Sequence, residues 1–233
     1  MWFVMFAFYN YLMKRNLLLV ASVLSFAFAT SCKNDKNLNA DNAVEAGAAS
    51  DEAVSYMVDT AASVIEWTGS KPTGKHNGTI KLSGGNLFMN GDVPESGNFT
   101  IDMSTITVLD LKSGDGKEDL EAHLKGANQG ADADHFFNTG KFPVGRFEIT
   151  RVNKADGKTL IEGNLTIKET TKNIKIPASV TIQGDQLTIV SDEFAIDRTL
   201  WNVNYGSKSV YDNLGDKFIN DNIDLKVTIK ASK

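Results

Sequence analysis

The chain has 233 residues, of which 42% are hydrophobic, and its 29 acidic side chains outnumber its 24 basic ones to give a formal net charge of −5. Nucleic-acid binding depends on basic stripes that contact phosphates, so this charge balance disfavours nucleic acid as a partner. Cys32 is the single cysteine, which excludes an intrachain disulfide.

The first 31 residues have the pattern of an export signal. Lys14 and Arg15 precede an apolar run that ends in small residues before Cys32. A positive region, a short apolar region and small residues before a cleavage point are typical of secretion signals. The run of about a dozen apolar residues is shorter than the ~20 that a transmembrane helix needs. We therefore predict an export signal over residues 1–31, with Met13 as a candidate true start of translation.

Cys32 follows directly on Ala29, Thr30 and Ser31 and resembles the cysteine of a bacterial lipoprotein box, whose thiol is acylated. We expect a lipoprotein of a bacterial cell envelope, periplasmic or anchored to a membrane through this residue. The alternative is an ordinary signal peptide that leaves an unused thiol. The sequence has no polybasic patch for membrane attachment, so attachment would depend on the acyl chains.

Residues 33–55 are rich in Asn, Asp and Ala and contain almost no large apolar side chain. Such a segment cannot bury enough apolar surface to offset the conformational entropy that ordering costs. We predict a lipidated N-terminus and disordered tether over residues 32–55, followed by a single folded domain over residues 56–233.

From residue 58 onward, alternating apolar and polar residues separated by Gly and Asn turns predict antiparallel strands. Successive side chains of a strand point to opposite faces, so each alternation gives one apolar and one polar face. The clearest apolar positions are Ile65 and Trp67, then Phe99, Ile101 and Met103, then Phe147 and Ile149, Leu165 and Ile167, and finally Leu225, Val227 and Ile229. We expect a hairpin turn at Gly84-Gly85. Evenly spaced short strands of this kind predict an all-β sandwich or barrel.

One stretch interrupts the strands. Residues 115–125 predict a short helix with Leu120, His123 and Leu124 on one face, and a Gly- and Asp-rich loop follows over residues 126–134. Helices and loops inserted between the strands of a barrel tend to lie over its mouth. We therefore expect this insertion near the barrel mouth.

Several short motifs follow one another along the predicted domain. They are Trp67-Thr68-Gly69-Ser70-Lys71, Gly74-Lys75-His76-Asn77-Gly78, Ile101-Asp102-Met103, Asp119-Leu120-Glu121-Ala122-His123-Leu124-Lys125, His135-Phe136-Phe137, Phe142-Pro143, Gly163-Asn164-Leu165-Thr166-Ile167 and Asp197-Arg198-Thr199. Their ordered set resembles the YceI-like family, and the resemblance implies an antiparallel lipocalin-like β-barrel of about eight strands that binds a polyisoprenoid lipid. Two departures are visible, because the loop over residues 126–133 looks longer than usual and Asn202 follows Trp201 where a Gly is expected.

The resemblance places the ligand inside the barrel, so the predicted lipid-binding residues are the inward-facing apolar ones and those near the mouth. They are Ile65, Trp67, Phe99, Ile101, Met103, Phe136, Phe137, Phe142, Phe147, Ile149, Leu165, Ile167, Phe194, Arg198, Trp201, Leu225, Val227 and Ile229. Their large rings could line a tunnel or simply fill the interior, and the sequence leaves both alternatives open. The ligand would be a polyisoprenoid or an isoprenoid quinone-like lipid, with no other cofactor.

Asp197 and Arg198 form a polar pair in an otherwise apolar segment that we interpret as a strand. Neighbouring residues of a strand point to opposite faces, so at most one of the two faces inward. An inward Arg198 would be costly unless it were paired with a carboxylate or a ligand head group. The two hypotheses are therefore a head-group contact and an ion pair at the rim that holds neighbouring strands.

The sequence offers no constellation for catalysis or metal binding. His76, His123 and His135 lack the close spacing of zinc ligands, and no Ser-His-Asp arrangement is visible. We expect a protein that is not an enzyme and that binds, stores or transports a long-chain isoprenoid or similar lipid in the cell envelope. The alternative is a ligand-free barrel that acts as an envelope protein-interaction module. A homodimer is left open.

Overall fold

The computed structural model describes residues 36–127, 133–155 and 158–233. The predicted export signal, Met13 and Cys32 lie outside the described residues, as does most of the loop over residues 126–133. None of the described helices is long and apolar enough to cross a membrane.

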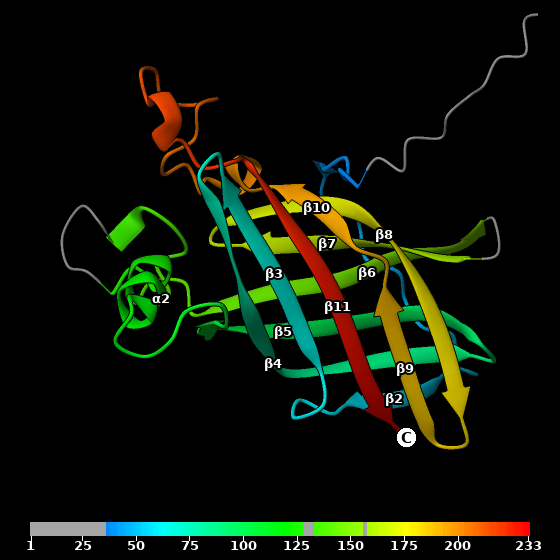
Figure 1. The fold of residues 1–233 in the computed structure, drawn as a ribbon. Helices are drawn as coiled ribbons and strands as arrows, with labels where there is room; N and C mark the ends of the chain where they lie inside the picture. Colours follow the sequence, from blue (N-terminus) through cyan, green and yellow to red (C-terminus); the bar gives the residue numbers. More distant parts are fainter. Residues whose placement is uncertain (1–35, 128–132, 156–157) are drawn as a thin grey trace, which may run out of the picture. The chain divides into compact units, whose positions relative to one another are not determined.

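The described part of the chain is built from antiparallel strands with one short α-helix (Figure 1). The strands are β1 (Asp41–Asn42), β2 (Val54–Val58), β3 (Val64–Lys71), β4 (Gly74–Asn90), β5 (Val93–Val108), β6 (Val144–Ala155), β7 (Lys158–Ile167), β8 (Thr170–Gln183), β9 (Gln186–Ser191), β10 (Phe194–Asp197) and β11 (Asn222–Ser232). The helices are α2 (Lys117–Lys125) and the 3-10 helices η2 (Arg198–Trp201) and η3 (Gly215–Lys217).

Eight of these strands pair in a closed ring. The order is β3-β4-β5-β6-β7-β8-β9-β11, and β11 pairs with β3 to complete it. Strand β2 pairs with β4 and β11, β10 continues along β11, and β1 lies on β8. Closure leaves no free sheet edge in the ring, and eight strands enclose an interior just wide enough for side chains or one slender ligand. The predicted all-β antiparallel barrel of about eight strands is confirmed.

The pairing register gathers the apolar positions on the inner face. On the two sides of β11, Leu225 lies opposite Trp67 of β3 and opposite Phe194 of β10, and Val227 lies opposite Ile65. A shift of one residue would turn every one of these side chains outward, so burial of the inner face fixes the register. The alternation seen in the sequence is therefore the alternation between the inside and the outside of the barrel.

Gly84 and Gly85 do not form the predicted turn. Strand β4 runs through both glycines, which pair with Thr100 and Phe99 of β5 beside a register shift. A Cβ on Gly85 would lie 2.6 Å from the carbonyl oxygen of Asn98, so the missing side chain lets the two strands approach closely. The real turn is at residues 91–92, where Gly91 has a φ of 59°.

The segment on the N-terminal side of the predicted folded domain also differs from the prediction. Residues 36–55 were expected to be disordered, but the structure places them along the outside of the barrel. The Leu38 amide donates to the carbonyl oxygen of Ala195 at 2.9 Å. The buried Asn164 side chain accepts from the Val44 amide at 3.1 Å and donates to its carbonyl oxygen at 2.7 Å. Backbone hydrogen bonds thus hold a segment whose own side chains supply little apolar surface, which composition could not reveal.

The connections β3–β4, β5–β6, β7–β8 and β10–β11 all lie at one end of the antiparallel barrel, here called the mouth end. The β5–β6 connection contains α2, and the β10–β11 connection contains η2 and η3 (Figure 1). The predicted helix is confirmed as α2, whose Glu121 carboxylate accepts from the Val108 amide at 2.9 Å and ties the helix to the end of β5. The helix ends at Gly126, which has a φ of 69°.

Candidate ligand-binding cavity

The barrel encloses a cavity of about 490 Å³. This volume lies within the range of about 300–1,000 Å³ that is typical of small-molecule sites. Most of the residues that line it are Ile, Leu, Val, Phe or Met, and most of these lie in the eight ring strands. The alternative of a barrel filled solid by its own rings therefore does not describe this interior.

Two large rings leave the centre open because glycines on neighbouring strands accommodate them. The indole of Trp67 lies against Gly78, where a Cβ would come within 2.7 Å of a ring carbon. The ring of Phe147 lies against Gly163 in the same way, with a ring carbon 2.3 Å from the position of a Cβ. Each ring is thus folded flat against the wall. The sequence motifs contain both glycines, but sequence reasoning did not predict that they pack against these rings.

The structure brings together all the residues of the predicted lipid-binding set except Phe142. Phe142 lies outside the cavity, where the amines of Lys141 and Lys168 stand 4.7 and 5.8 Å from its ring centre. The Phe142 amide donates to the Asn138 carbonyl oxygen at 2.8 Å, and this turn sets Phe142 apart from the other predicted residues, in a small hollow with Lys141 and Lys168.

Sequence reasoning missed a second set of wall residues. It comprises Ile80, Leu82, Ile106, Leu120, Leu124, Ile161, Ile174, Ile176, Ala178, Ile189, Ile196, Val203, Ile219 and Ile223. Ile161, Ile196 and Ile223 share the parity of predicted residues in their own strands, so the alternation contained the signal that would have found them. Ile106 has the opposite parity to Ile101 and Met103, because the register of β5 shifts between Asp102 and Thr107. Leu120 and Leu124 project from the predicted apolar face of α2. Phe137 lies beside the end of this helix, where its amide donates to the Leu124 carbonyl oxygen at 3.2 Å.

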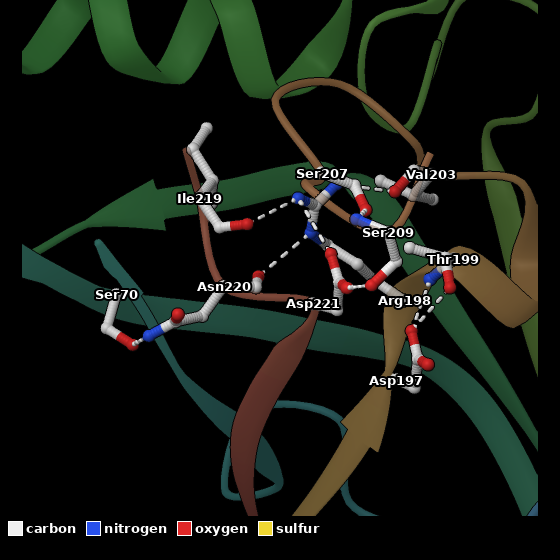
Figure 2. Close-up of polar contacts among 10 residues, drawn as sticks. All are labelled: Ser70, Asp197, Arg198, Thr199, Val203, Ser207, Ser209, Ile219, Asn220 and Asp221. Carbon is white, nitrogen blue, oxygen red and sulfur yellow. Dashed lines mark hydrogen bonds and ion pairs between the residues drawn. The ribbon is translucent and has the colours of Figure 1, made fainter. Parts of the chain in front are cut away.

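Arg198 has a different place from the one predicted (Figure 2). It begins η2 rather than continuing a strand, and its side chain is 2% exposed. Its guanidinium donates to the carbonyl oxygens of Asn220, Val203 and Ile219. Burial lowers the pKa of this guanidinium from its ordinary value, against the opposing effect of nearby carboxylates.

The carboxylate nearest to Arg198 in this arrangement belongs to Asp221, whose Oδ1 is 3.8 Å from Nη2. Asp197 instead caps η2, because its Oδ1 accepts from the Thr199 amide at 2.9 Å and from the Thr199 hydroxyl at 2.6 Å. Arg198 therefore forms its ion pair with Asp221, while Asp197 takes no part in it. Arg198 lies in the cavity wall, but its donors hold the β10–β11 connection in place.

Trp201 and Asn202 lie at the C-terminal end of η2. The Trp201 side chain is fully buried, and its indole nitrogen donates to the Leu165 carbonyl oxygen at 3.0 Å. Asn202, which stands where a Gly was expected, has a φ of 59°. Asn tolerates this left-handed conformation better than most residues, so the departure from the pattern keeps the backbone turn.

An aromatic cluster stands at the mouth end, formed by His123, His135, Phe136 and Tyr205. The Nε2 of His123 lies 3.0 Å from the Nδ1 of His135, and the His135 ring stacks on Tyr205 with centroids 4.1 Å apart. Phe136 meets the His123 ring edge-on at 5.1 Å. The cluster joins α2, the segment after the loop and the β10–β11 connection into one cover. Among the described residues, no group of three or more His, Cys, Asp or Glu side chains is arranged to hold a metal ion.

Comparison with known proteins matches these features to one family. The YceI-like domain model matches residues 56–231. No curated protein matches the chain. BcnA from Burkholderia cenocepacia is similar in structure, with a TM-score of 0.58 and 19% identity over 75% of this chain and 99% of that one. A polyisoprenoid binding domain from Saccharophagus degradans, implicated in plant cell wall breakdown, has a TM-score of 0.53 and 12% identity over 76% of this chain and 97% of that one. At these identities the structural likeness shows the fold.

Proposed function

Because the chain belongs to the YceI-like domain family, we propose that its barrel holds one long-chain isoprenoid, or a similar apolar lipid, and stores or transports it in the cell envelope. The observation that carries the proposal is the open apolar interior of about 490 Å³. The similarity to a polyisoprenoid binding domain supports the same ligand class. A wall of hydrocarbon side chains binds a chain without activating it, so the proposed role is binding rather than catalysis.

The energetics favour exchange over permanent capture. Burial of one isoprene unit contributes roughly 3–4 kcal/mol relative to water, at about 0.8 kcal/mol per methylene. In a cell envelope the competing environment is the interior of a bilayer, which is as apolar as the cavity wall. The net free energy of transfer from membrane to barrel is therefore small, which suits a carrier that loads and unloads.

We also propose that the protein is exported and acylated at Cys32, which would keep the barrel beside a membrane. Metabolic labelling with a fatty-acid analogue checks this part, since the label should appear on the wild type and be lost from Cys32→Ser. Labelling that persists in Cys32→Ser would contradict it. Lipid binding by the barrel does not depend on this result.

Uptake from vesicles tests the main proposal. Delipidated protein is mixed with vesicles that contain a fluorescent prenyl lipid and is then separated from them by gel filtration. We expect about one lipid per barrel in the protein fraction, because the cavity has room for one slender chain. A protein fraction without label would overturn the proposal and leave the protein-interaction module as the better account.

A further inference from the structure

The ionisable side chains that line the cavity in the described part of the chain include several cations and no carboxylate. Those in its wall are Lys71, Lys75, His76, His123, Arg198, Tyr205 and Lys217. Among the described residues, no Asp or Glu lines it, although acidic side chains outnumber basic ones in the chain as a whole. The surroundings of the cavity are therefore positive on a protein whose net charge is negative.

The lysines of this set mark the opening of the cavity. Lys71 and Lys75 flank the tip of the β3–β4 hairpin, and Lys217 ends η3 in the β10–β11 connection. All three are exposed, whereas much of the apolar wall is buried. In β3, Lys71 has the same parity as Ile65 and Trp67, which places it on the cavity face.

Two hydrogen bonds join the elements that carry these lysines. The Asn220 amide donates to the carbonyl oxygen of Ser70 at 2.8 Å, and the Asn220 side-chain amide donates to the Ser70 hydroxyl at 2.8 Å (Figure 2). The Arg198 guanidinium also holds this part of the β10–β11 connection, because it donates to the carbonyl oxygens of residues 219 and 220. The hairpin tip and η3 are thus held at one place on the rim.

The three amines have no acidic partner among the residues that the structure describes. Within the described part of the chain, no carboxylate oxygen comes within 4.0 Å of the amine of Lys71, Lys75 or Lys217. Asp110 lies near this end but is engaged by His76, at 2.8 Å, and by a backbone amide. Asp221 is engaged by Arg198 and Ser209.

We propose, on the premise of the lipid-binding function above, that the ligand has an anionic head group, a phosphate or a carboxylate, which lies between Lys71, Lys75 and Lys217. The tail would extend past Trp67 into the apolar interior. Ammonium groups are compact charges that contact phosphate and carboxylate oxygens directly. Beside an apolar wall the effective dielectric constant is below that of water, so these attractions are stronger than at an open surface. A neutral alcohol would gain little from them.

Three ligands with one tail test the head group. The probes are C20 isoprenoids that end in a phosphate, a carboxylate or a hydroxyl, each used below the concentration at which it forms micelles, and affinity is read from quenching of tryptophan fluorescence. Each exposed charge contact contributes a factor of roughly two to five, so both anions should bind about tenfold or more tightly than the alcohol. This advantage should shrink as salt shortens the Debye length from about 30 Å at 0.01 M to about 3 Å at 1 M. If the phosphate probe binds more tightly than the carboxylate probe, the ligand is a phosphorylated lipid. If the carboxylate probe binds more tightly, the ligand resembles a fatty acid.

Matched lysine variants assign the effect to the rim. The combined variant Lys71→Gln, Lys75→Gln and Lys217→Gln should reduce the affinity for both anions to that for the alcohol and leave the affinity for the alcohol unchanged. The control variant replaces three lysines outside the cavity lining, Lys81, Lys226 and Lys230, by Gln and should keep the anion preference.

Each contrary result has a separate meaning. Equal affinities for the three probes in the wild type would overturn the anionic head group while leaving lipid binding intact. A rim variant that keeps its anion preference but loses attachment to anionic vesicles would show that the lysines contact membranes instead, and would also overturn it. Failure to bind any of the three probes would reject lipid binding itself.

Discussion

Filling the cavity at Gly69 should abolish tight lipid binding while the protein stays folded. Gly69 lies on the cavity face of β3, and no atom lies within 4 Å of the position of an added Cβ. A Gly69→Phe ring would therefore enter empty space near the mouth. It would displace roughly one isoprene unit of the ligand, which is about 4 kcal/mol of burial at ~0.8 kcal/mol per methylene. Because the chain can shift to regain part of this, we expect a loss in affinity of between about tenfold and a thousandfold.

Titration with a C20 isoprenoid alcohol measures this loss, and thermal unfolding measures stability. Replacement of a strand glycine removes unfolded-state entropy, so Gly69→Phe should unfold at the same temperature or higher. Gly140→Phe is the matched control, because Gly140 also has no neighbour within 4 Å of an added Cβ but lies on the exposed surface outside the cavity. Unchanged affinity, with the new ring shown crystallographically to occupy the cavity, would refute the reasoning.

Three further predictions concern other parts of the molecule. Arg198→Met should lower the free energy of unfolding by about 3–5 kcal/mol in urea, since three carbonyl groups and Asp221 lose their partner; a loss below about 1 kcal/mol would contradict this. Ala178→Leu, at the end of the cavity far from the mouth, should weaken binding of C20 chains more than that of C10 chains, and an equal effect on both would place the ligand elsewhere. Hydrogen bonds from the amide and hydroxyl of Ser50 hold the pKa of Glu95 below its ordinary value, so this contact is present above about pH 4.3 and is lost as the pH falls through the lowered pKa. The NMR signal of the Ser50 amide should shift on acidification and in Glu95→Gln at neutral pH, and a signal unchanged by both would contradict the contact.

The barrel could be predicted because its signal is local and repeated. The alternation that ends in Ile223, Leu225, Val227 and Ile229 defines an inner and an outer face before any partner strand is known. The turn expected at Gly84-Gly85 failed for the opposite reason. A pair of glycines is compatible both with a turn and with a bulged strand. Only the close approach of β5 shows that Gly84 and Gly85 lie in a strand.

The candidate site likewise has residues that the alternation predicts and features that depend on contacts between strands. The predicted rings of the strands, such as Trp67, Phe99 and Phe147, were found from parity, and they line the cavity. Whether they fill the barrel or line a cavity depended on Gly78 and Gly163, which pack against rings on the neighbouring strands. The partners of Arg198 come from residues 203–221. Lys217 lies in a connection with no regular pattern, so its place in the same cavity wall as Lys71 could not be predicted.

Composition misled the prediction for residues 36–55. Their side chains are small and polar, which is typical of disorder, yet their backbone groups find partners on β7, β10 and the β4–β5 region. A segment that is held by its main chain leaves no hydrophobic pattern in the sequence.

Mass spectrometry of organic-solvent extracts shows whether the barrel carries a lipid in the cell. The protein is purified from the envelope of the cells that make it, without added lipid, beside the Gly69→Phe variant. We expect one long-chain lipid per barrel in the wild-type extract, with an acidic head group, and much less of it in the extract of the variant. A wild-type extract without such a lipid, from protein that is folded and whose cavity remains empty, would contradict the proposed lipid binding.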